Sequence, residues 1–353
     1  MAFIGNNNSS IKGISVCIPN NVISNWDYEL IPEEEREKFI KGIGIETRHI
    51  TDENTTTSDL CYKAAEHLIE KLQWDKSDIE LLVFITQTPD YKMPATSCVL
   101  QDRLGLPTTS MAIDISQGCS GYVYGLSVVG SLLSSGSIKK ALLLTGNTQS
   151  KNVNYEDQSS YPLFGDAGSA TAIEYSVDNS DEMKFHFVTD GSGKDTIIIP
   201  DGGYRNPVTK DSFVVEEFDG GIKRNRLNLR MEGDDTFSFV ISEVPKAINR
   251  LFNHYGLNKD DLDFYLLHHA SKFTCERLRK KMKFDPDKTP LVLKDYGNSS
   301  NASIPLLFTT ALRDKVLNEK IRCMISGFGV GLSLGIGVIS IGNLECSDLI
   351  KYE

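Results

Sequence analysis

Two stretches decide the fold of this chain: Trp74–Thr86, WDKSDIELLVFIT, and Leu257–His269, LNKDDLDFYLLHH. Each begins with a polar capping segment, passes through two acidic residues that flank an aliphatic one, and ends in an apolar run typical of a buried strand. A helical pattern precedes each run. In the first copy its apolar face consists of Leu60, Ala64, Ala65, Leu68, Ile69 and Leu72. The same unit therefore occurs twice, about 180 residues apart.

The similarity between the two copies continues beyond these stretches. Ala141–Gly146, ALLLTG, resembles Arg322–Gly327, RCMISG. Each run leads to a Gly-rich segment, Phe164–Ile173 in the first copy and Phe328–Gly337 in the second. An ordered series of matches at one offset indicates an internal duplication.

The duplication predicts two α/β halves, residues 1–176 and 237–353. Strand and helix patterns alternate within each half, so we expect parallel sheets with helices on their faces. Residues 177–236 interrupt the repeat and are rich in Asp, Gly, Lys and Arg. We expect them to form an excursion over the surface.

Composition excludes several classes of protein. With 37 Lys plus Arg and 48 Asp plus Glu, the formal charge is -11, which argues against a nucleic-acid partner bound through its phosphates. The seven cysteines are dispersed and include no C-x-x-C pair, so neither a metal site nor a disulfide framework is expected. The first ten residues lack a basic segment followed by an apolar run. We therefore expect a cytoplasmic protein.

One uncharged stretch, Cys323–Leu344, is long enough to cross a membrane, but six of its residues are Gly. Glycine weakens a helix interior, and the pattern favours buried strands around a Gly-rich turn. We expect no membrane contact.

Cys119 is the candidate nucleophile. It follows the short strand pattern at Ile113–Ile115, stands between Gly118 and Gly121, and precedes a helical run. A thiol at a helix N-terminus has a lowered pKa, because unpaired backbone N–H groups and the helix dipole favour the thiolate. The alternative is a buried structural cysteine.

The second half ends its strand with His268 and His269, and then carries a Gly297-Asn298 turn before another helix. In the duplication Asn298 lies close to the position that matches Cys119. We therefore expect a thiol, an imidazole and a carboxamide to converge. Adjacent residues in a strand face opposite ways, so at most one histidine serves the site. A Cys-His-Asn set suits either enolate stabilisation or hydrolysis.

These motifs together resemble β-ketoacyl-acyl carrier protein synthase III, a family of the thiolase superfamily. The resemblance runs nearly from end to end, and its signatures are Gly44–His49, the Cys119 turn, Phe164–Asp166, the His269 strand end, Gly297–Pro305 and Gly327–Gly331. It implies a duplicated five-layer α/β/α/β/α fold. It also implies that no cofactor or metal is needed.

The resemblance implies a reaction in two stages. Cys119 accepts an acyl group from a thioester primer, and malonyl-acyl carrier protein then loses carbon dioxide and condenses with it. His269 and Asn298 would assist decarboxylation, while His268 would be structural. Gly331 would join the Cys119 N–H in an oxyanion hole. The product would be a 3-oxoacyl carrier protein for fatty-acid or related acyl-chain synthesis.

Some positions depart from the family pattern. Lys38 and Gln158 stand where members that use acetyl-coenzyme A have a Trp and an Arg. The primer carrier, coenzyme A or acyl carrier protein, therefore stays open. Met93 stands where a partner subunit commonly contributes a Phe to the acyl pocket, and this implies a homodimer.

A basic segment follows the histidines. In Lys272–Lys283 a helix would turn Cys275, Leu278 and Met282 inward and leave Arg277, Lys280 and Lys281 outward. With Lys272, these cations form a candidate docking site for the acidic carrier protein; the alternative is a solvated face. Two other functions also stay open, an acyltransferase or hydrolase of the superfamily and a catalytically silent scaffold subunit.

Overall fold

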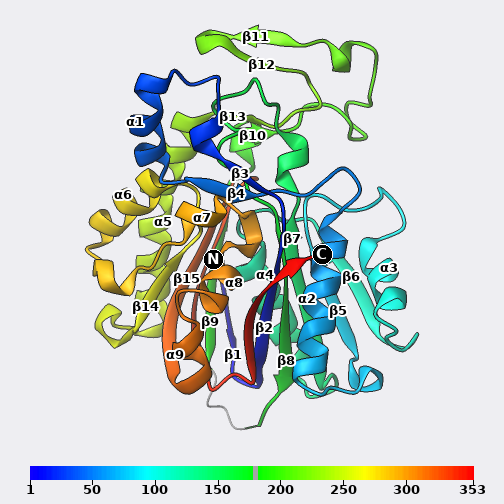
Figure 1. Ribbon diagram of the computed structural model, residues 1–353. Coiled ribbons are helices and arrows are strands. Elements are labelled where there is room, and N and C mark those ends of the chain that lie inside the picture. The colour runs from blue at the N-terminus through cyan, green and yellow to red at the C-terminus, as the bar shows by residue number, and fades with distance from the viewer. Residues whose placement is uncertain (178–181) are drawn as a thin grey trace.

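The computed structural model describes residues 1–177 and 182–353. It has a thiolase-like architecture of two large sheets and three layers of helices, stacked α/β/α/β/α, with three two-stranded sheets outside these layers (Figure 1). This confirms the predicted fold class.

Each sheet combines strands from distant parts of the chain. The five-stranded sheet has the order β1 (Ala2–Asn6), β9 (Met183–Thr189), β16 (Ser333–Gly342), β15 (Lys320–Gly329), β14 (Phe264–Leu267). The six-stranded sheet has the order β17 (Cys346–Tyr352), β2 (Ser9–Pro19), β8 (Ala167–Tyr175), β7 (Lys140–Asn147), β5 (Leu81–Ile85), β6 (Met111–Ile115). The C-terminal strand β17 thus joins the sheet of the first half, and pairs in parallel with β2.

The strand directions reveal the duplication. In the first half, β5 and β7 are parallel, β7 and β8 antiparallel, and β8 and β2 antiparallel. In the second, β14, β15, β16 and β9 follow each other with the same three relations. The sheets are therefore mixed, and the expectation of parallel sheets is wrong, because the Gly-rich strands turn back as hairpin partners.

The position of β9 corrects the predicted excursion. It lies inside residues 177–236, yet it is a buried strand between β1 and β16. It corresponds to β2, so the second copy begins at β9 rather than near residue 237. Residues 178–181 of the predicted excursion lie outside the described residues.

Helices fill the three remaining layers. The core between the sheets contains α4 (Gly121–Leu133) and α8 (Ser303–Thr309), with α9 (Arg313–Asn318) at its edge. On the outer face of the six-stranded sheet lie α2 (Thr57–Lys71) and α3 (Thr96–Arg103). On the other outer face lie α5 (Gly233–Tyr255) and α6 (Lys272–Met282). Figure 1 shows α4 and α8 between the sheets.

Shorter elements gather at the end of the molecule where β5, β7 and β14 finish (Figure 1). They are α1 (Glu33–Ile43), α7 (Leu293–Tyr296) and the pairs β3 (Val22–Ser24) with β4 (Thr47–His49), β10 (Ile197–Ile198) with β13 (Arg230–Met231), and β11 (Glu216–Phe218) with β12 (Ile222–Arg224). Within the predicted excursion, the part that contains β10 to β13 therefore lies outside the two large sheets.

The uncharged stretch Cys323–Leu344 forms most of β15 and β16, as predicted. Within the described residues, no helix is both long enough and apolar enough to cross a bilayer.

Candidate active site

Cys119 lies between β6 and α4, two residues before the first residue of the helix. The turn is tight, because the Gly121 N–H donates to the Gly118 carbonyl at 2.7 Å. A Cβ on Gly118 would stand 2.5 Å from Oε1 of Gln87, and one on Gly121 would stand 2.9 Å from the Ile85 side chain. A side chain at Gly121 would press on Ile85, and one at Gly118 would displace the end of the Gln87 side chain, so the two glycines keep the turn around Cys119 compact.

The end of β15 passes directly over Cys119. A Cβ on Gly327 would stand 2.7 Å from the Cys119 carbonyl oxygen, and one on Gly329 would stand 3.1 Å from the sulfur. A Cβ on Gly331 would instead meet Ser333, so Gly329 is the glycine against the sulfur. The role expected of the Gly331 N–H, as a donor in the oxyanion hole, stays a prediction.

Asn298 reaches the same place from the second half, just before α8. Its N–H donates to the Leu163 carbonyl at 2.8 Å, and its carbonyl accepts from the Gly165 N–H at 3.1 Å. The backbone N–H of Ser300 donates to Oδ1 of Asn298 at 2.9 Å. This contact fixes the orientation of the amide. The Nδ2 group is left as a donor with no hydrogen-bond partner among the described residues.

The structure reverses the prediction for the two histidines. His268 lines the same cavity as Cys119 and Asn298, whereas His269 does not. Side chains alternate along β14, so that Leu266 packs in the core between the sheets while Leu267 packs against the outer helices. His268 continues the face of Leu266 and His269 continues that of Leu267. The imidazole of the site is therefore that of His268.

The two histidines also differ in the hydrogen bonds of their ring nitrogens. The Nδ1 atom of His268 lies 2.9 Å from Oγ of Ser303, at the start of α8. If Ser303 donates, the Nε2 of His268 carries the ring hydrogen. His269 is fully buried, and neither of its ring nitrogens has a well-formed hydrogen bond among the described residues, although the backbone of Pro290 lies near enough to oppose the lowering of its pKa by burial.

Burial dominates the electrostatics of the site. It raises the pKa of the Cys119 thiol to about 11, although a hydrogen bond from Ser300 acts in the opposite direction. Burial thus has a larger effect on this pKa than the hydrogen bonds at the turn, and the net shift is opposite to the lowering expected from the helix N-terminus. Burial and the neighbouring His269 lower the pKa of His268 to about 3, so this imidazole is neutral at pH 7.

The three side chains open into one cavity of about 1550 Å³. Its walls come from α1, the first turns of α5 and α6, and β10 and β13 of the excursion. Ile197, Leu229 and Phe164 pack together on one side. The cavity is large and mostly apolar near the excursion, so it can hold an extended acyl or pantetheine-like chain.

The positions that depart from the family pattern lie on the cavity wall. Lys38 of α1 and Gln158 both line it. The Gln158 side chain donates to the Gly220 carbonyl at 2.7 Å and so joins the cavity wall to the excursion. Met93 lies elsewhere, in an exposed loop, with 73% of its surface accessible.

Helix α6 has the predicted faces. Cys275 and Leu278 are buried and Met282 is half-buried, while Lys272, Arg277, Lys280 and Lys281 are exposed. Phe273 and Thr274, in the first turn, line the cavity. The four cations thus lie on the same helix as these two cavity-lining residues.

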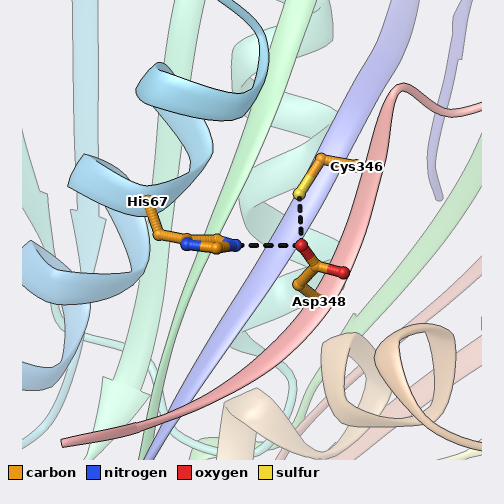
Figure 2. A group of neighbouring side chains, drawn as sticks. All are labelled: His67, Cys346 and Asp348. Carbon is orange, nitrogen blue, oxygen red and sulfur yellow. Dashed lines mark hydrogen bonds and ion pairs between the residues drawn. The ribbon is translucent and has the colours of Figure 1, made fainter.

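One group of possible metal ligands lies outside the cavity, within the described part of the chain. It consists of His67 on α2 with Cys346 and Asp348 on β17 (Figure 2). Asp348 already accepts from His67 at 2.9 Å and from Arg313 at 2.9 Å. The carboxylate therefore already has two side-chain donors, and the group is a network of paired side chains.

Sequence reasoning missed two residues at the nucleophile, Ser300 and Asn147. The Ser300 hydroxyl lies 3.6 Å from the Cys119 sulfur, and Asn147 donates to that hydroxyl at 3.0 Å. In the sequence, only their positions next to other motifs could have pointed to them. Asn147 ends the repeated strand after Gly146, and Ser300 lies within the turn that carries Asn298.

Comparisons with known proteins identify the family of this chain. The family model described as 3-oxoacyl-[acyl-carrier-protein (ACP)] synthase III matches residues 113–191, and the model of the family's C-terminal part matches residues 252–341. A putative 3-oxoacyl-[acyl-carrier-protein] synthase 3 of Campylobacter jejuni is 34% identical, over 98% of this chain and 97% of that protein. The chain belongs to the 3-oxoacyl-[acyl-carrier-protein] synthase III family.

Other members extend the similarity. The β-ketoacyl-[acyl-carrier-protein] synthase III of Clostridioides difficile is 31% identical, over 95% of this chain and 98% of that protein. A 3-oxoacyl-(acyl-carrier protein) synthase structure from Burkholderia xenovorans superimposes with a TM-score of 0.93 at 35% identity and covers 99% of both chains. The family membership and the five-layer fold therefore extend over the whole chain.

Proposed function

We propose that this chain catalyses the decarboxylating condensation of an acyl thioester primer with malonyl-acyl carrier protein, the reaction named by its relatives. The observation that carries the proposal is the meeting of Cys119, His268 and Asn298 in one cavity. A thiol, a neutral imidazole and an oriented amide are the groups that acyl transfer followed by enolate chemistry requires.

In the first stage the Cys119 sulfur attacks the carbonyl carbon of the primer thioester. The new C–S bond forms as the bond to the carrier thiol breaks, and that thiol takes up the proton lost by Cys119. The oxyanion forms next to the sulfur, and Gly329 is close enough that a Cβ there would stand 3.1 Å from it, which supports the backbone around Cys119 and Gly329 as the donor site.

In the second stage the malonyl group loses carbon dioxide, and the electron pair of the broken C–C bond moves onto the thioester carbonyl. His268 and Asn298 donate to the resulting enolate oxygen, the first from Nε2 in the tautomer that accepts from Ser303, and the second from Nδ2. The enolate carbon then attacks the acyl-Cys119 carbonyl, and the Cys119 thiolate leaves. A neutral His268 supports this role, because an N–H donor is needed and no proton needs to be lost.

The carrier protein would dock beside α6. The support is the position of Arg277, Lys280 and Lys281, exposed next to the residues of α6 that line the cavity. An acidic carrier meets a local cationic surface there, although the chain as a whole is acidic.

The primer carrier is coenzyme A or acyl carrier protein, and the choice depends on the cavity wall around Lys38 and Gln158. Comparing acetyl-coenzyme A with acyl carrier protein thioesters of matched chains distinguishes the two. We further propose a cytoplasmic homodimer in which Met93 reaches the acyl pocket of the partner; its exposure supports an intersubunit role.

The decisive experiment follows the two stages separately. The purified chain is incubated with primer thioesters and the mass added at Cys119 is located by peptide mapping. Malonyl-acyl carrier protein is then added and the 3-oxoacyl product is measured. Acylation at Cys119 followed by condensation supports the proposal, and product formation without Cys119 acylation contradicts it.

The same experiment covers the other functions. Release of the acyl group to water would indicate a hydrolase, and an unreactive Cys119 would indicate a silent scaffold. Neither is favoured, because the reported relatives are synthases and Cys119 opens into the cavity.

A further inference from the structure

We propose that Ser300 donates its hydroxyl hydrogen to the Cys119 sulfur, and that Asn147 is the positioning residue that fixes this direction. The inference goes beyond the Cys119, His268 and Asn298 roles. It concerns the groups that make the nucleophile a thiolate, and it holds whatever primer the enzyme accepts.

The first step is the contact at the sulfur. Ser300 Oγ lies 3.6 Å from Cys119 Sγ, and it is the one side chain found within hydrogen-bond distance of that sulfur among residues 1–177 and 182–353. A thiolate can only accept. In the reactive state the hydroxyl must therefore be the donor.

The second step is the orientation of Asn147. Its Oδ1 accepts from the backbone N–H of Gln87 at 2.9 Å. A backbone N–H is always a donor, so the oxygen of the amide must face Gln87 and the NH2 group must face Ser300. The assignment of Asn147 Nδ2 as the donor to Ser300, at 3.0 Å, then follows from geometry.

The third step joins the two contacts into one directed chain. Gln87 donates to Asn147, Asn147 donates to Ser300, and Ser300 is left to give its own hydrogen to Cys119. Because Asn147 can only donate through Nδ2, it cannot accept the Ser300 hydrogen and draw it away from the sulfur. Donors that lie in series strengthen one another in a buried site.

The backbone conformation of Ser300 is unusual, which supports a functional role for this residue. Ser300 has a φ of 51°, in the left-handed region that non-glycine residues seldom adopt. A serine kept there is held by its surroundings, and such positions concentrate at functional sites. Its N–H meanwhile holds Asn298, so one residue orients the amide through its backbone and the thiol through its side chain.

His268 does not perform the same task. It is neutral, and its Nδ1 is occupied by Ser303. The imidazole that shares the cavity with the Cys119 thiol is therefore neutral rather than an imidazolium. The Ser300 hydrogen bond is the side-chain contact that opposes the effect of burial on Cys119.

The test measures the rate of Cys119 alkylation by iodoacetamide against pH in the intact protein. Peptide mapping is needed because Cys98 is also exposed and will react. Ser300→Ala should raise the apparent pKa of Cys119 by about one unit, which lowers the alkylation rate at a fixed pH below that pKa roughly tenfold. Ser300→Gly should do the same.

Two serine variants are used because they separate the hydroxyl from the backbone. Alanine keeps the cost of a positive φ and glycine removes it, but both lose the hydroxyl. Ser299→Ala is the matched control, since Ser299 is an adjacent buried serine whose hydroxyl has no partner among the described residues. Its pH profile should equal that of the parent.

A double-mutant cycle tests the role of Asn147. Asn147→Ala should raise the apparent pKa of Cys119 in the parent but not in the Ser300→Ala background, because its action passes through Ser300. An equal shift in both backgrounds would show that Asn147 acts on the sulfur in another way and would overturn its assigned role.

The proposal for Ser300 stands independently of that cycle. If Asn147→Ala fails to fold, because the Gln87 N–H has lost its acceptor, the two Ser300 variants and the Ser299 control still decide the question. Parent-like profiles in both Ser300 variants would overturn it. Because alkylation needs no acyl substrate, this result is also separate from success or failure of the proposed condensation.

Discussion

Among the described residues, two cysteines have a side-chain hydrogen-bond partner, and the comparison between them explains why one is a nucleophile. Cys119 lies beside a hydroxyl that is held as a donor by Asn147. Cys346, on the seam between α2 and β17, lies beside the Asp348 carboxylate, with its sulfur 3.5 Å from Oδ2 (Figure 2). Burial raises the pKa of both thiols, to about 11 at Cys119 and about 12 at Cys346.

The neighbours then act in opposite directions. Ser300 lowers the pKa of Cys119, whereas the charge of Asp348 and its hydrogen bond raise that of Cys346. A donor stabilises the thiolate and an acceptor stabilises the thiol. A polar neighbour alone does not make a cysteine reactive. Its reactivity depends on whether that neighbour donates or accepts the hydrogen bond, and on whether the sulfur opens into a cavity.

The largest expected effect is the loss of enzymatic activity when Cys119, but not Cys346, is replaced. Cys119→Ala should abolish both acyl transfer and condensation, because the acyl group has no acceptor. Cys119→Ser should also be poor, since an alcohol is far less ionised than a thiol near pH 7. Cys346→Ala should keep parent activity. Condensation is measured from primer thioester and malonyl-acyl carrier protein, and a normal rate in Cys119→Ala would refute the mechanism.

The next effect tests the corrected histidine. His268→Ala and Asn298→Ala should each slow malonyl decarboxylation by about 10²–10³-fold, the loss typical of removing one oxyanion donor. Both should still acylate Cys119, because these donors act in the second stage.

His269→Gln is the matched control, since it changes the adjacent buried imidazole that faces the outer helices. Decarboxylation of malonyl-acyl carrier protein by the pre-acylated protein measures all three variants. A parent-like rate in His268→Ala, with a slow rate in His269→Gln, would restore the assignment made from the sequence.

The α2–β17 seam should contribute stability rather than chemistry. Burial raises the pKa of the Asp348 carboxyl, but hydrogen bonds from His67 and Arg313 outweigh it and hold that pKa below its usual range. Asp348→Asn should therefore lower the free energy of unfolding at pH 7 by about 1–3 kcal/mol, the typical cost of unpairing charged hydrogen-bond partners. Denaturant unfolding measures the change.

The sign of the pH effect follows from the lowered pKa. The stabilisation is present above the pKa that Asp348 has in the unfolded chain, near 3.9, and is lost as the pH falls through the lower folded value. The gap between parent and Asp348→Asn should close in strong acid. The exposed Asp102→Asn serves as control, and a gap that stays constant down to pH 2 would contradict the account.

Much of this architecture was accessible from the sequence because it is encoded locally and twice. The repeated strand patterns predicted two halves, and the turns before the two middle helices predicted that Cys119 and Asn298 meet. These residues sit at equivalent points of the duplication, so the symmetry brings them together whatever the details of the sheets.

The predictions that failed concern contacts between segments that are far apart in the sequence. The strand Phe264–Leu267 is apolar throughout and buried on both faces. Its sequence therefore lacks the alternation of polar and apolar residues that would indicate which histidine faces the cavity. β9 is recognisable only by its partners β1 and β16, and β17 joins the sheet of the other half. Ser300 and Asn147 come from opposite halves and touch only in the folded chain.

The smallest effect concerns how the active end of the molecule meets its partner. Arg277→Glu/Lys281→Glu on α6 should raise the apparent KM for malonyl-acyl carrier protein by about 3- to 10-fold at low salt, because complementary charge chiefly speeds association. The difference should shrink as salt screens it. Acylation of Cys119 by a small primer thioester should be unchanged.

The other region supplies the matched control. Lys63 and Lys71 are exposed cations of α2, so Lys63→Glu/Lys71→Glu makes the same change in net charge on the seam beside Cys346. If docking is local to α6, only the α6 variant should lose carrier affinity. If both pairs raise KM equally, net charge rather than a docking surface explains the effect. If neither does, the cations of α6 form a solvated face, and the carrier approaches the cavity by another side.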